Sequence, residues 1–124
     1  MSKMKSIDLH EGTGRTRVCF SAHSIGGDLI VRLYNEQEHI GAVALSEYHP
    51  GEKRASTSVI TRFGHKDDSV AYAAAHKICK SLHKPVCAIA GIHLDAITEA
   101  EIKQITANCN RLIDRYVESV ASGQ

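Results

Sequence analysis

The chain has 124 residues, of which 43% are hydrophobic, with 15 Lys and Arg against 14 Asp and Glu. This length allows one hydrophobic core and leaves no room for a second, so we expect a single domain over residues 1–124 with an ordered core of about 7–120. The near-neutral charge gives no electrostatic basis for binding nucleic acid. Because Trp is absent and aromatic residues make up 5% of the chain, base-stacking platforms are also disfavoured.

The longest apolar stretch, about residues 85–92, is too short to cross a bilayer, and the start of the chain lacks the apolar segment of a signal peptide. We therefore expect a cytoplasmic protein with no membrane partner. The cysteines are widely spaced, without a Cys-x-x-Cys pair, and lie within apolar periodic segments. Buried, reduced thiols are expected in preference to metal ligands or disulfides, at Cys19, Cys79, Cys87 and Cys109.

The first half of the chain predicts an antiparallel meander. Ile7 and Leu9 alternate with polar residues, a Gly-Thr-Gly turn follows, and Gly26-Gly27 supplies a second tight turn. The next strand, 29–34, places alternate apolar residues on its two faces. Strands are predicted over about 7–10, 15–25, 29–34, 39–47 and 55–63.

The second half predicts helix, strand, helix. From Asp67 or Asp68 the apolar residues recur at helical spacing until Pro85 ends the pattern. The apolar run 86–90 predicts a central strand buried on both faces. Thr98 and Glu101 have the spacing of a capping box, which begins a second amphipathic helix.

This order predicts an α+β fold, in which an antiparallel five- or six-stranded sheet carries two helices on one face. Two helices leave the other face uncovered. Since residues such as Ile30 and Tyr34 keep that face partly apolar, a partner subunit could bury it, and we expect a homodimer.

Two strand-to-helix loops, 64–68 and 91–95, each bring a glycine, a histidine and carboxylates to a helix N-terminus. If the strands before them are parallel neighbours, both loops lie at the same edge of the sheet and form one site. One of Asp67 and Asp68 is expected to cap the first helix, which leaves the other for the site.

These loops leave two chemical interpretations open. His65, His93 and a carboxylate from Asp67, Asp68 or Asp95 could hold a divalent metal ion such as Fe(II), Mn(II) or Zn(II), with Asp95 the preferred third ligand. Alternatively, the same side chains cap helices and bond loop carbonyls. Lys66, beside a helix N-terminus, suits a phosphate or carboxylate group.

Two other segments carry candidate ligand contacts. Arg15 and Arg17, at alternate positions of one predicted strand, could hold a phosphate together, or they are simply exposed. His39 precedes the small-residue run 40–44, which leaves room for a flat ligand or for close strand packing. No Ser/His/Asp triad or nucleophile elbow can be assembled from the spacing.

Taken in order, the segments 14–18, 39–44, 64–68 and 90–95 resemble the prenylated flavin chaperone family, to which the small D subunit of gallate decarboxylase belongs. The His-Lys-Asp-Asp and Gly-Ile-His runs are the most specific parts. The resemblance implies a proteasome-assembly-chaperone-like fold, a homodimer, and a chaperone that binds prenylated FMN and delivers it to a UbiD-type decarboxylase of (hydroxy)aromatic acids. The family's recurring polar positions match Arg15, Arg17, His39, His65, Lys66, Asp67, Asp68, His93 and Asp95.

Two alternatives stay open beside this carrier, which would perform little or no turnover. One is a small metal-dependent enzyme using His65, His93 and an aspartate, such as an oxidative maturase of the prenylated flavin. The other is a non-catalytic assembly subunit of a decarboxylase complex.

Overall fold

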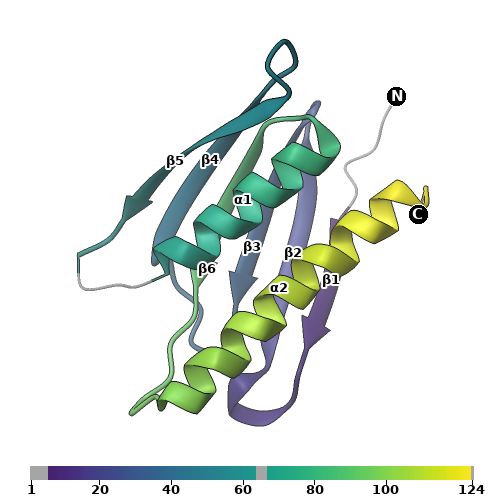
Figure 1. The fold of residues 1–124 in the computed structure, drawn as a ribbon. Helices are drawn as coiled ribbons and strands as arrows, with labels where there is room; N and C mark the ends of the chain where they lie inside the picture. The colour runs from purple at the N-terminus through teal and green to yellow at the C-terminus, as the bar shows by residue number, and fades with distance from the viewer. Residues whose placement is uncertain (1–5, 64–66, 124) are drawn as a thin grey trace.

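The computed structural model describes residues 6–63 and 67–123. Within these ranges the chain forms six strands, two long helices and one short 3-10 helix, in the predicted order of strands, helix, strand, helix (Figure 1). The elements are β1 (Ser6–Glu11), η1 (Gly14–Thr16), β2 (Val18–Ile25), β3 (Asp28–Tyr34), β4 (Ala42–His49), β5 (Arg54–Thr61), α1 (Asp68–Leu82), β6 (Val86–Gly91) and α2 (Glu99–Ala121).

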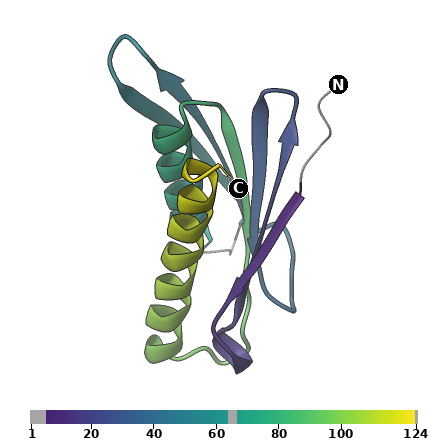
Figure 2. The same cartoon turned by 90° about the vertical axis from the view of Figure 1, so that its right-hand side faces the viewer.

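The strands form one sheet in the order β1-β2-β3-β6-β4-β5, and both helices lie on the same face of it (Figure 2). The predicted α+β class is therefore confirmed. The sheet is mixed rather than wholly antiparallel, because β3 and β6 pair in parallel. The continuous meander was wrong: β6 inserts between β3 and β4, whose connection is a loop outside the sheet.

Strand direction explains why the loops gather at one edge. We had expected β5 and β6 to be parallel neighbours. They are not adjacent, because β4 lies between them and pairs antiparallel with both. Two reversals leave β5 and β6 pointing the same way, and β1 and β3 share that direction. The segments after β1, β3, β5 and β6 therefore all start from the same edge of the sheet.

The core lies between the sheet and the helices. α1 covers β4, β5 and β6, and α2 covers β1 and β2. The alanines Ala71, Ala74 and Ala75 of α1 are fully buried, which lets the helix approach the sheet closely. β6 is central, as predicted, but not buried on both faces, because Cys87 and Ile89 are half-buried on the face that carries no helix.

Several local predictions are settled by the elements themselves. The Thr98 capping box is present, with the Thr98 hydroxyl accepting from the Glu101 N–H and the Glu101 carboxylate accepting from the Thr98 N–H. Residues 15–17 do not belong to a strand, because η1 occupies this turn and β2 begins at Val18. His39 also lies outside a strand, since β4 begins only at Ala42.

All four cysteines are free, with Cys79 and Cys109 buried and the other two, Cys19 and Cys87, half-buried. Burial raises the pKa of the Cys109 thiol to about 12, and a nearby carboxylate adds to this effect. Among the described residues, no helix is long and apolar enough to cross a membrane.

Candidate functional site

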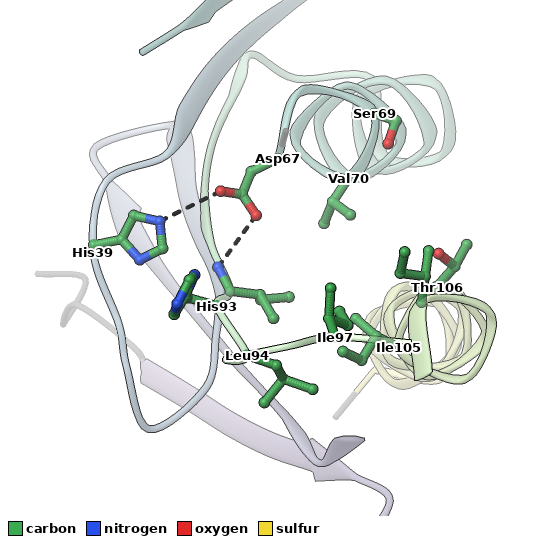
Figure 3. Close-up of a pocket in the computed structure, with 11 residues that line it drawn as sticks. His39, Asp67, Ser69, Val70, His93, Leu94, Ile97, Ile105 and Thr106 are labelled. Atoms are coloured by element: carbon green, nitrogen blue, oxygen red, sulfur yellow. Dashed lines mark hydrogen bonds and ion pairs between the residues drawn. The ribbon is translucent and has the colours of Figure 1, made fainter. Parts of the chain in front are cut away.

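A cavity of about 360 Å³ opens between the N-terminal end of α1, the segment after β6 and the first turns of α2 (Figure 3). This volume is within the range of roughly 300–1,000 Å³ that is typical of small-molecule sites. Six aliphatic side chains and five polar residues surround it. The aliphatic ones are Val70, Ile92, Leu94, Ile97, Ile102 and Ile105, and the polar ones are His39, Asp67, Ser69, His93 and Thr106.

Asp67 connects three segments at the back of this cavity. The residue is 7% exposed, and one carboxylate oxygen accepts the backbone N–H of Ile92 at 3.2 Å. The other oxygen lies 3.5 Å from His39 Nε2, in the loop between β3 and β4 (Figure 3). His39 Nδ1 lies 2.9 Å from the carbonyl oxygen of Gln37, which can only accept, so Nδ1 carries a hydrogen.

This arrangement corrects one prediction. Asp67 occupies the N-cap position of α1 but makes no side-chain cap bond, because its carboxylate points to the segment after β6. Asp68 is the first residue of α1, is exposed, and does not line the cavity. The carboxylate of the site is therefore Asp67, and Asp68 is not brought to it.

Two glycines make room for this contact. A Cβ atom on Gly41 would overlap the Asp67 carboxylate, and a Cβ on Gly91 would overlap the backbone carbonyl group of His39. Gly91 lies on the face of β6 that carries no helix. The contact with His39 shows that the loop between β3 and β4 crosses the end of this strand. Larger residues at either position would push Asp67 or His39 out of place.

Asn35, directly after β3, is the second connection. Its amide NH₂ donates to the His93 carbonyl at 2.8 Å, and its carbonyl accepts from the backbone N–H groups of His93 and Gln37 at 3.3 and 3.2 Å. The residue is 8% exposed. Its three bonds fix the segments after β3 and β6 side by side, and no local pattern in the sequence signals this long-range role.

His93 and Asp95 lie together but at the surface. His93 Nε2 is 3.0 Å from Asp95 Oδ1, and the two side chains are 54% and 83% exposed. In the described part of the chain, no group of three or more His, Cys, Asp and Glu residues could hold a metal ion. His65, the remaining member of the predicted metal set, lies outside the described residues, so the structure gives the metal prediction no support.

The residues that were predicted to contact a phosphate group do not gather at one site. Arg15 does not face a ligand site: its Nε donates to Glu101 at 2.8 Å and its Nη2 to the Asp95 carbonyl at 2.8 Å. Arg17 is exposed at the end of η1, so the two arginines do not share a strand face as predicted. Lys66 lies outside the described residues.

The Arg15 contact has a clear electrostatic signature. Hydrogen bonds from Arg15 and from Thr98 lower the pKa of Glu101 to about 2, and the same carboxylate raises the pKa of Arg15. Arg15 therefore holds the start of α2, and with it the segment that carries His93, against the turn after β1. It positions the site instead of binding in it.

Comparison with known proteins agrees with this fold and with the earlier resemblance. The family model described as "Prenylated flavin chaperone LpdD-like domain" matches residues 12–121. A search of curated proteins gave no match. A chain in "Crystal Structure of a Novel Chaperone Complex for Yeast 20S Proteasome Assembly" superposes with a TM-score of 0.60 at 13% identity and 96% coverage of both chains, which confirms the predicted fold. Since the family model covers nearly the whole described structure, this chain belongs to the prenylated flavin chaperone family.

Proposed function

We propose that this chain binds prenylated FMN in the cavity beside Asp67 and delivers it to a UbiD-type decarboxylase of (hydroxy)aromatic acids. The observation that carries the proposal is the family match over residues 12–121, in a chain whose described residues form a cavity of about 360 Å³ where the loops meet. The cytoplasm is the proposed location, on the sequence grounds given above.

The lining of the cavity suits the ring system of such a ligand. A prenylated isoalloxazine is flat and largely apolar, and the aliphatic side chains from α1, α2 and the segment between them offer a matching surface. Hydroxyl groups of Ser69 and Thr106 and the imidazole of His93 can bond the polar edge of the ring.

Release is as important for a carrier as binding. Ile97 and Ile102, which line the cavity, are 41% and 48% exposed. A ligand held here stays accessible from one side, so a decarboxylase can take it up without unfolding the chaperone. Burial of these two side chains by the ligand supplies part of the binding free energy, at roughly 25 cal/mol per Å² of apolar area.

A homodimer is proposed through the face of the sheet that carries no helix. Leu45 and Ile60 are 58% and 75% exposed there, and Ile30 and Val43 are half-buried around them. The strand register places them on β3, β4 and β5, with Cys87 of β6 between Ile30 and Leu45. A contiguous apolar patch of this kind is typical of a protein contact.

A spectral titration with prenylated FMN, followed by transfer to an apo decarboxylase, tests the function. Ile102→Glu places a charge in the cavity at a half-exposed position, and we expect it to weaken binding by at least about tenfold. Ile25→Glu, at a 51% exposed position beside the turn after β2, is the matched control and should bind normally. No spectral change with the unmodified chain, or no transfer of activity, would rule out the proposal.

Elemental analysis separates the carrier from the metal-dependent alternative. Protein purified without a His-tag would hold stoichiometric metal if the maturase interpretation were right, and a His93→Ala variant would lose it. The carrier proposal requires that the unmodified chain bind prenylated FMN equally well whether or not metal is supplied.

A further inference from the structure

A second cavity of about 270 Å³ lies on the other side of His39. It is bounded by residues of β3 and β6 and by the loop that follows β3: Arg32, Leu33, Tyr34, Glu38, His39, Ile40 and Ile89. Arg32 and Ile89 are register partners on the face of the sheet that carries no helix. His39 lines both cavities, so they meet at the end of the sheet.

The two cavities have different charges. Among the described residues that line the first one, none is Lys or Arg, and Asp67 contributes a carboxylate. The charge that the described residues bring to this cavity, a carboxylate, disfavours a phosphate group. The second cavity contains a guanidinium group, that of Arg32, which always carries a positive charge.

The contacts of Arg32 leave its side chain suited to binding an anion. Its guanidinium lies over the Tyr34 ring, 4.4 Å from the ring centre, and this stacking restricts the side chain. Its acidic neighbour, Glu38, is 3.9 Å away and 60% exposed, which is a loose contact at the limit of an ion pair. The arginine thus keeps most of its hydrogen-bond donors for a ligand, and Glu38 can turn away into solvent.

We propose that Arg32 binds the phosphate group of prenylated FMN in this second cavity, while the ring system occupies the first. The proposal rests on the proposed function. FMN carries its phosphate on a flexible ribityl chain, so the two groups can bind on opposite sides of His39. Arg15, by contrast, already donates to Glu101 and to a backbone carbonyl. Arg32 therefore takes the role of phosphate contact that the sequence suggested for Arg15.

The test compares prenylated FMN with the same compound after removal of its phosphate by a phosphatase. We expect Arg32→Ala to weaken binding of the phosphorylated form about tenfold and to leave the dephosphorylated form unchanged. Arg32→Lys keeps the charge and should retain part of the difference between the two forms. Glu38→Gln removes a competing carboxylate and should strengthen binding of the phosphorylated form alone by about threefold.

Arg54→Ala is the control. This exposed arginine pairs with Glu52 at the other end of the strands, where β5 begins, so its removal should change neither affinity. The inference fails if Arg32→Ala weakens both forms equally or neither, or if Lys66→Ala produces the selective loss instead. If the unmodified chain binds neither form, the proposed function fails and the inference with it. Unchanged melting temperatures would show that each variant is folded.

Discussion

A single methyl group at position 41 should break the contact that connects the loops of the site. In Gly41→Ala, the added Cβ would overlap the Asp67 carboxylate and lie 2.8 Å from its Cγ, so the side chain must rotate away. Asp67 then loses the 3.2 Å bond from the Ile92 N–H and its approach to His39. A lost hydrogen bond to a charged group costs roughly 1.5–3 kcal/mol.

The lower entropy of the unfolded chain offsets roughly 0.4–1 kcal/mol of that loss when Gly is replaced by Ala. We therefore expect a net destabilisation of about 1–2 kcal/mol, or roughly 4–8 °C in Tm for a domain of this size. Chemical denaturation and thermal melting measure both quantities. Gly51→Ala is the control, since nothing lies within 4 Å of a Cβ there, and it should be neutral or slightly stabilising.

A double-mutant cycle tests the mechanism directly. In an Asp67→Ala background the overlap with the carboxylate is gone, and the next nearest atom is the Ala90 carbonyl oxygen, 3.0 Å from the new Cβ. Gly41→Ala should then cost little, which gives a coupling free energy of about 1–2 kcal/mol between the two positions. An equal loss of unfolding free energy on Gly41→Ala in both backgrounds would refute the idea that Gly41 is needed to make room for the Asp67 side chain.

Three further outcomes are expected. Gly91→Ala should destabilise the chain more than Gly41→Ala, because its Cβ meets a backbone carbonyl that cannot rotate away, and denaturant unfolding compares the two. Since the folded-state pKa of Glu101 is lowered to about 2 from 4.5, its contact with Arg15 should stabilise the fold fully above about pH 5 and be lost as the pH falls through about 2. NMR titration of the Glu101 carboxyl group checks this, and an ordinary titration near pH 4.5 would contradict it. Maleimide at pH 8 should label half-buried Cys19 well before Cys109, whose thiol is buried with a pKa of about 12, and mass spectrometry of digests gives the order.

Local patterns predicted the individual elements well. The helical spacing after Asp67 and Pro85 beyond its end delimit α1, observed as Asp68–Leu82. The alternation in 29–34 correctly placed Leu29, Val31 and Leu33 on the buried face. These features depend on neighbours within one or two turns or on the period-2 pleat, so the sequence contains them directly.

Strand pairing depends on residues far apart, and here prediction failed. The apolar run 86–90 indicated a central strand, but nothing in it chooses β3 and β4 as its neighbours. For the same reason, the partner of Arg15 could not be foreseen, since Glu101 is 86 positions away. Asp67 and His93 do line one cavity, as their shared sheet edge suggested, although the strands before them are not the adjacent pair that we had assumed. His39, which was predicted to begin a strand, joins them from the loop between β3 and β4.

The chemistry of the site follows from how its polar groups are used. Asn35 and Asp67 form hydrogen bonds with backbone groups of neighbouring segments, and Arg15 does the same from outside the cavity. What the first cavity presents to a ligand is therefore mostly aliphatic surface, which attracts flat apolar rings without strong directional bonds. Contacts of that kind make release less costly than bidentate ionic ones do, and a carrier needs release. In the proposed site, recognition of charge falls to Arg32, on the far side of His39, where a half-buried and loosely paired guanidinium can exchange one anion for another.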